Sequence, residues 1–145
     1  MRRALACGAL IALLITSVAM AATKTYKGKI EGDQPSSVLL KVKRHHGERA
    51  LKSFAANDFV ISCRGSGDAT LAGATLIAPP GAAIKVSDKG RFEATGSVGD
   101  QVLELVGKLS GRHSAAGTLH YSGPTPVDDA TEDCDSGELQ WSASR

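Results

Sequence analysis

Five carboxylates near the end of the chain form the densest group of side chains suited to chemistry: Asp128, Asp129, Glu132, Asp133 and Asp135. Carboxylate oxygens are the ligands that Ca²⁺ prefers, so these five are candidate calcium ligands. Their spacing, however, is not the Asp-x-Asp-x-Asp-Gly pattern of an EF-hand loop. We therefore favour a solvated segment, partly neutralised by Arg64, and we predict no bound metal and no cofactor.

The histidines offer a second set of reactive side chains. His45 and His46 are adjacent, and adjacent side chains on a strand point to opposite faces, so we expect a basic hairpin tip rather than a metal site. His120 lies on the expected outward face of its strand. No Gly-x-Ser-x-Gly nucleophile elbow is present. An enzyme is therefore not predicted; a hydrolase would have to use His120, His113 and the acidic segment.

The first residues of the chain have the pattern of a secretory signal peptide. Arg2 and Arg3 precede an apolar run from residue 4 to about residue 15, and Ala19-Met20-Ala21 is a small-x-small cleavage site. An uncleaved anchor is the alternative, but the run is short for a span, which needs roughly 20 apolar residues. We expect residues 1–22 to be cleaved and residues 23–145 to form a single domain.

Cleavage changes the charge balance and the cysteine count. Removing residues 1–22 takes away two arginines and no acid, leaving 15 basic and 15 acidic residues. A formally neutral domain gives no sign of nucleic-acid binding. Cys63 and Cys134 remain, and an even count in an oxidising compartment favours a disulfide. Two free thiols or a metal site are the alternatives, although the chain has no Cys-x-x-Cys spacing.

Stepping along the chain, alternating apolar residues predict strands with one buried face. The clearest are residues 59–63, the hairpin of 101–109 with 114–122, and the closing stretch 134–145. Residues 55–58 read as a turn and 123–133 as a long acidic loop. The expected core residues are Trp141, Leu139, Tyr121, Leu119, Phe59 and Ile61. Were Trp141 and Tyr121 exposed instead, they would form a carbohydrate platform.

Further strands are expected at residues 25–31, 37–43, 83–87 and 91–95, with extended chain over 70–78. About eight to ten short strands, with a turn signal every eight to twelve residues or so, are typical of all-β domains. We predict an all-β fold, an antiparallel β-sandwich of jelly-roll type. The alternative is a closed antiparallel β-barrel.

The end of the chain resembles a group of small exported all-β proteins from actinomycete-type bacteria. These proteins pair an internal cysteine with an ending of the form Gly-x-Leu … Cys-x-Ser/Thr-Gly-x-x-x-Trp-x-Ala. The matching residues here are Gly117, Leu119, Cys134, Ser136, Gly137, Trp141 and Ala143, with Cys63 as the earlier cysteine. The resemblance implies secretion, an all-β fold and a disulfide, and implies no substrate.

These observations favour a secreted or envelope-bound, non-catalytic binding or cell-surface accessory module, with an extracellular protein or glycan as its partner and no membrane span after cleavage. Such a module should expose an apolar or concave face. A barrel that carries a small ligand is the second hypothesis and predicts an interior poorly filled by Ala and Gly. A hydrolase is the third and requires titratable groups that converge in a cleft.

Overall fold

The computed structural model describes residues 22–145 with the exception of residues 33 and 46. The expected signal peptide at residues 1–22 therefore lies outside the described residues, apart from Ala22, and so does His46. Throughout the described part, the chain forms strands joined by turns and short irregular segments, with no helix. The all-β class is thus confirmed. In the same part of the chain, no helix has the length and apolarity that crossing a bilayer requires.

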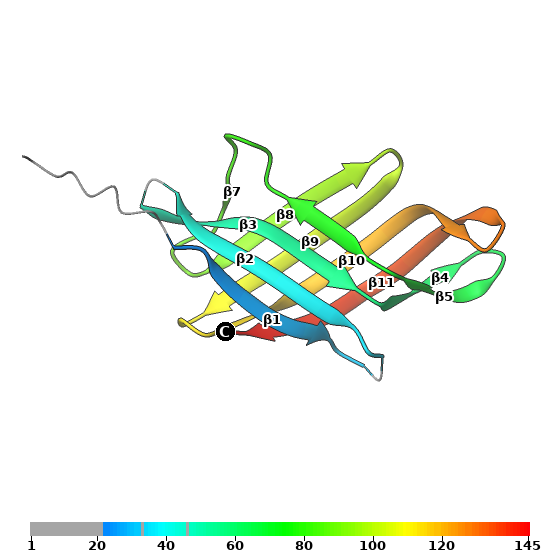
Figure 1. Ribbon diagram of the computed structural model, residues 1–145, viewed down its shortest axis with the longest axis horizontal. Helices are drawn as coiled ribbons and strands as arrows, with labels where there is room; N and C mark the ends of the chain where they lie inside the picture. Colours follow the sequence, from blue (N-terminus) through cyan, green and yellow to red (C-terminus); the bar gives the residue numbers. More distant parts are fainter. Residues whose placement is uncertain (1–21, 33, 46) are drawn as a thin grey trace, which may run out of the picture.

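Within the described residues, eleven strands form one antiparallel sheet (Figure 1). Their bounds are β1 Lys24–Ile30, β2 Ser37–His45, β3 Glu48–Asn57, β4 Phe59–Cys63, β5 Gly67–Leu71, β6 Ala74–Ile77, β7 Ile84–Lys85, β8 Arg91–Val98, β9 Gln101–Ser110, β10 Ser114–Val127 and β11 Ala130–Ser144.

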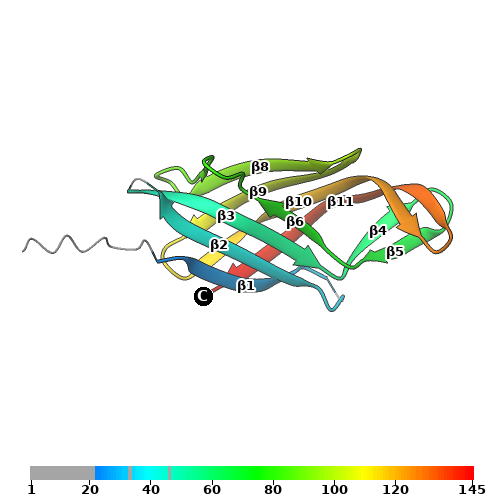
Figure 2. The same ribbon diagram turned by 45° about the horizontal axis from the view of Figure 1, so that its top comes forward.

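The sheet curls until it is almost closed. Its strand order is β6-β3-β2-β1-β11-β10-β9-β8, so β6 and β8 are the two free edges, and they approach each other without pairing. Of the two architectures expected from the sequence, the barrel is therefore the one observed, in place of a two-sheet sandwich (Figure 2). The barrel has a seam between β6 and β8, which no hydrogen-bonded ladder bridges.

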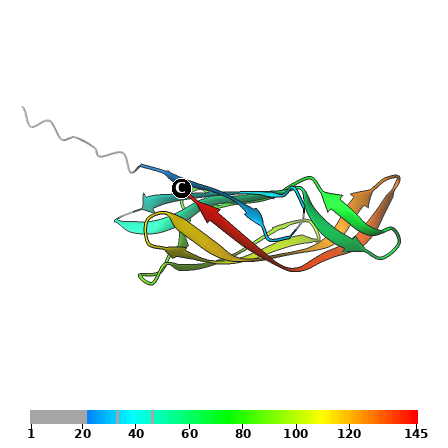
Figure 3. The ribbon, with the colours of Figure 1, turned by 90° about the horizontal axis from the view of Figure 1, so that it is seen from below.

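Two hairpins project together from one end of the barrel, opposite the end where the chain terminates (Figures 1 and 3). One is β4–β5, and the other is the distal part of β10–β11. Cys63 and Cys134 are directly opposed across β4 and β11 and are joined by a disulfide, which confirms the expected pairing. We call these two joined hairpins the arm.

The prediction of a long acidic loop over residues 123–133 is wrong. β10 continues to Val127, Asp128-Asp129 forms the turn, and β11 begins at Ala130. The two prolines in this stretch are tolerated because β9 pairs with β10 only as far as Ser122, so the rest of β10 is an edge on that side. The expected turn at residues 55–58 is also too long: β3 runs through Asn57, and the chain turns at Asp58.

Trp141 is the centre of the core. Its side chain is 1% exposed and packs with ring centroids 5.3 Å from Phe54 and 6.4 Å from Phe92. Of the other expected core residues, Leu139 is half-buried against the core and the remaining four are buried: Tyr121, Leu119, Phe59 and Ile61.

Glycines make room for this aromatic layer. Trp141, Gly117, Gly107 and Phe92 follow one another across β11, β10, β9 and β8. A side-chain carbon on Gly107 would collide with the Phe92 ring, and one on Gly117 would collide with the backbone of Val106. Both positions therefore require glycine, and the strands approach each other closely here.

Replacing Trp141 with Ala should cost about 3–5 kcal/mol of unfolding free energy, because it leaves a large cavity in the layer. Trp141→Phe should cost markedly less, since it keeps a ring and removes Nε1, which has no hydrogen-bond partner. Val106→Ala, at a half-exposed site on β9, is the matched control. Urea unfolding measures all three, and a Trp141→Ala variant as stable as the parent would contradict the proposed layer.

Removing the disulfide with the double change Cys63→Ala and Cys134→Ala should cost up to about 4 kcal/mol, because the bridge closes a loop with a sequence separation of 71. β4 otherwise pairs with β11 only through Cys63 and Ser62. Hydrogen exchange should therefore quicken first in β4 and β5, with the β9–β10 amides as the internal control. Uniform loss of protection would show that the bridge does not hold the arm specifically.

Candidate functional site

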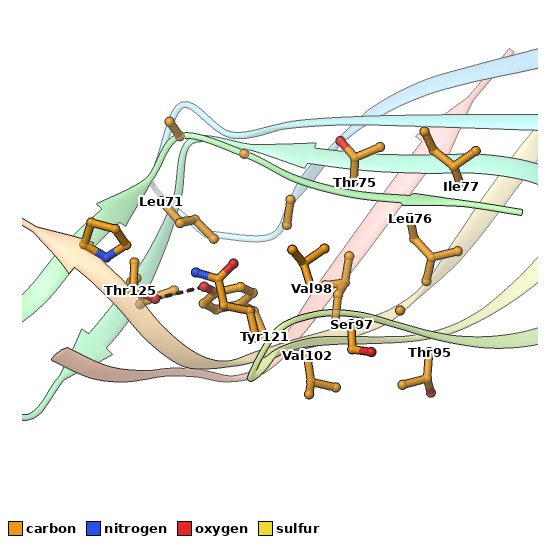
Figure 4. Close-up of a pocket in the computed structure, with 18 of the residues that line it drawn as sticks. Leu71, Thr75, Leu76, Ile77, Thr95, Ser97, Val98, Val102, Tyr121 and Thr125 are labelled. Carbon is orange, nitrogen blue, oxygen red and sulfur yellow. Dashed lines mark hydrogen bonds between the residues drawn. The ribbon is translucent and has the colours of Figure 1, made fainter. Parts of the chain in front are cut away.

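A cleft of about 1090 Å³ runs along the seam between β6 and β8 (Figure 4). Ile77 of β6 and Val98 of β8 line it and are 68% and 79% exposed. Leu76 points from β6 towards β8. A side-chain carbon on Gly96 of β8 would lie 3.4 Å from Leu76 Cγ, so these two residues face each other closely across the seam.

Apolar side chains from several strands line the cleft. Ala94 and Ile84 lie at one end, where the wall reaches towards the filled part of the barrel. Leu103 and Ile61 contribute buried surface, and Leu71 brings the arm into the wall. Among the described residues that line the cleft, Asp128 alone carries a charge. A cleft of this size and composition is typical of a site for a small, largely apolar molecule.

One buried polar group marks the end of the cleft nearest the arm. Tyr121 Oη and Thr125 Oγ1 are 2.8 Å apart, and Thr125 Oγ1 also donates to Gly123 O at 3.2 Å (Figure 4). Thr125 is 4% exposed, so its polar side chain is buried. Gln101 Nε2 donates to Pro124 O at 2.7 Å. This end of the cleft thus contains buried hydrogen-bonding groups.

A β-bulge in β11 lies opposite Tyr121. The register between β10 and β11 shifts between His120 and Ser122, and the extra residue is on β11. Ser136 Oγ accepts the Tyr121 N–H at 2.8 Å, and Gly137 takes a positive φ of 61°. Tyr121 faces inward and His120 outward through the regular alternation of β10. The bulge instead reverses the alternation of β11, so that Cys134 is buried while Asp135 is exposed beside His120.

His120 is held between two carboxylates on the outer face. Its Nδ1 lies 3.1 Å from Glu104 Oε2, and its Nε2 lies 3.0 Å from both oxygens of Asp135. These bonds, first to Asp135 and then to Glu104, raise the pKa of His120 above its ordinary value. The Gly137 N–H and then His120 lower the pKa of Asp135. Because both ring nitrogens face carboxylates, the arrangement is an ion-pair strap across β9, β10 and β11 rather than a hydrolytic triad.

The acidic segment does not converge on one point. Asp128 and Asp129 form the turn at the tip of the arm. Asp133 lies 4.0 Å from Arg64, and Asp135 contacts His120. Glu132 accepts the N–H groups of Gly65 and Ser66 at 2.8 Å, and these bonds lower its pKa, Ser66 first.

Within the described residues, no three His, Cys, Asp or Glu side chains gather where they could hold a metal ion. Calcium binding by Asp128, Asp129, Glu132, Asp133 and Asp135 remains a hypothesis from the sequence. The carbohydrate platform is not formed either, because Trp141 and Tyr121 are both buried. Tyr121 instead forms part of the cleft floor, a role that the sequence pattern alone did not indicate.

The comparisons with known proteins add no relative: no protein family, no curated protein and no solved structure matches this chain. The site therefore has to be interpreted from its own geometry. The resemblance to small exported actinomycete-type proteins stays a prediction.

Titrating His120 tests the strap. Its pKa in the folded protein should lie above 6.5, so its stabilising contribution is complete below about pH 6.5 and is lost as the pH rises through the folded-state value. Asp135 contributes above 3.8 and loses that contribution as the pH falls through its lowered pKa. The ion pair between His120 and Asp135 thus contributes most between about pH 3.8 and pH 6.5.

NMR of the His120 ring measures this shift directly. Asp135→Asn should lower the His120 pKa more than Glu104→Gln does, because Asp135 makes the larger contribution. Glu138, which is opposite His120 in the β10–β11 register, is the remaining charged neighbour, and Glu138→Gln serves as the control. A His120 that titrates at or below 6.5 in the parent would contradict the strap.

Proposed function

We propose that this chain is an exported, non-catalytic binding module that holds an uncharged, largely aliphatic small molecule in the cleft between β6 and β8. The observation that carries the proposal is the cleft itself: about 1090 Å³ in volume, open along the seam, and lined by uncharged side chains apart from Asp128. Export is supported by the signal-peptide pattern in residues 1–22 and by the Cys63–Cys134 bridge, which suits an oxidising compartment.

The packing of the barrel favours a ligand site rather than a core that is merely poorly filled. Along β8, the inward side chains shrink from Phe92 to Ala94 to Gly96. Phe92 packs with Trp141, whereas Ala94 and Gly96 both line the cleft. A protein interior normally has few voids larger than a water molecule. A hollow of this size, produced by small residues on one strand, is what a ligand-carrying barrel requires.

The geometry also favours a small molecule over a protein partner that adds a strand at the seam. An inserted strand needs roughly 4.8 Å on each side to pair with both edges. Leu76 instead lies within van der Waals contact of the position that a side-chain carbon on Gly96 would take, so it occupies space between β6 and β8. A strand paired with both edges therefore has no room at this point.

Filling the cleft tests the proposal. Ala94→Phe places a ring inside it, while Glu93→Phe adds the same ring one residue away on the exposed face of β8. The uncharged fluorescent probe N-phenylnaphthylamine should bind the parent and Glu93→Phe with enhanced emission. Its affinity for Ala94→Phe should fall by about tenfold or more, which corresponds to about 1.4 kcal/mol.

Two results would overturn the proposal. If the probe binds none of the three proteins, the cleft does not take apolar molecules. If Ala94→Phe binds the probe as tightly as Glu93→Phe does, the binding site lies elsewhere. Thermal melts of the variants, measured in parallel, show whether each remains folded.

A further inference from the structure

Resting on the proposed function, we infer that the ligand carries a hydroxyl head group, a hydrogen-bond donor, and that this group is bound at the Tyr121–Thr125 end of the cleft with the aliphatic chain directed towards Ala94. The inference depends on where the hydrogens at this end must lie. It selects an alcohol over a carboxylate of the same chain length.

The two hydroxyl hydrogens at the polar end are already committed. Each hydroxyl carries one hydrogen, and that of Thr125 is directed to Gly123 O at 3.2 Å. The bond of 2.8 Å between Thr125 Oγ1 and Tyr121 Oη must therefore use the Tyr121 hydrogen. Tyr121 is left with its oxygen lone pairs and no hydrogen to donate. To a ligand, Tyr121 Oη is an acceptor.

Gln101 contributes both kinds of group. One hydrogen of its Nε2 is used by Pro124 O, at 2.7 Å, which leaves Oε1 as an acceptor and one N–H as a donor. Pro124, which accepts the Gln101 bond, lies between Gly123 and Thr125 in the sequence. The Gln101 side chain and the Tyr121–Thr125 pair therefore adjoin the same segment of β10. A ligand hydroxyl, which donates one hydrogen and accepts others, matches this set.

A carboxylate does not match it. Among the described residues that line the cleft there is no Lys, Arg or His to neutralise an anion, and the one charged residue, Asp128, is itself acidic. A carboxylate would face the lone pairs of Tyr121 without a hydrogen between them, and the free N–H of Gln101 would be its one donor at this end. Burying a charged group without a partner is costly, so an anionic head group is selected against.

The strand register orients the chain of the ligand. Gly96, Leu103 and Tyr121 are neighbours across β8, β9 and β10, and Ala94, Leu105 and Leu119 form the next inward row. From Tyr121, the cleft therefore runs towards Ala94 and Ile84, where its lining is uncharged. A molecule with its hydroxyl near Tyr121 buries its hydrocarbon chain in that direction.

Displacement of N-phenylnaphthylamine by three matched compounds tests the head group. These are 1-dodecanol, dodecyl methyl ether, which is neutral and only accepts, and dodecanoate, which is anionic. On the parent protein, 1-dodecanol should bind about five- to tenfold more tightly than the ether, as expected for one hydrogen bond, and dodecanoate should bind most weakly.

Two variants separate a head-group contact from a structural effect. Tyr121→Phe removes the acceptor and leaves Thr125 bonded to Gly123, so the advantage of 1-dodecanol over the ether should largely disappear. Thr125→Val removes the partner of the Tyr121 hydrogen and frees that hydrogen for the ligand. Dodecanoate should then gain affinity relative to 1-dodecanol, a change in preference that general loosening of the cleft would not produce.

The outcomes distinguish the two proposals. If all three compounds displace the probe equally well, or dodecanoate displaces it best from the parent, the hydroxyl inference is wrong and the apolar cleft stands. If none of the three displaces a bound probe, both proposals fail. Should a variant not fold, the ranking on the parent protein still decides the question.

Discussion

The packing of Trp141 between Phe54 and Phe92 is the interaction on which the rest of the structure depends. This ring contacts Phe54 of β3 and Phe92 of β8 from β11, and the Phe92 ring has its place because Gly107 carries no side chain. The chain has few aromatic residues, and three of them pack together in this one layer, which fills that end of the barrel. The neighbouring rows contain Ala94 and Gly96 and stay open. The core and the cleft are thus two results of one uneven distribution of side-chain volume.

The disulfide has a complementary role at the other end. Beyond the barrel, β4 and β5 pair with little of the main sheet, and the bond between Cys63 and Cys134 fixes them to β11. This position brings Ile61 and Leu71 into the wall of the cleft, opposite the polar end formed by β10. The covalent bridge therefore holds one wall of the site, and Tyr121 of β10 forms part of its floor.

Much of the fold follows from the sequence, where strict alternation marks strands such as residues 59–63 and the hairpin that contains Leu119. The disulfide also follows, from the two cysteines that lie outside the predicted signal peptide. The arm could not be predicted, because Pro124, Pro126 and the acidic residues have the composition of a loop and form strands only through pairing with β11. The cleft could not be predicted either. Its residues come from distant segments, and the curvature of the whole sheet, rather than any local pattern, brings Leu76 opposite Gly96.

The unpaired seam affects how quickly a molecule can be exchanged. In a barrel closed by hydrogen bonds, a guest that enters through the wall must break a ladder of backbone bonds, and the barrier rises with each one. In the described part of this chain, β6 and β8 meet through side-chain packing alone. A change in the rotamer of Leu76 and a slight separation of the two edges would open the wall while every β-ladder stays intact. If the cleft holds a small molecule as proposed, its entry and release would then require no unfolding, and a rigid scaffold would be compatible with fast exchange.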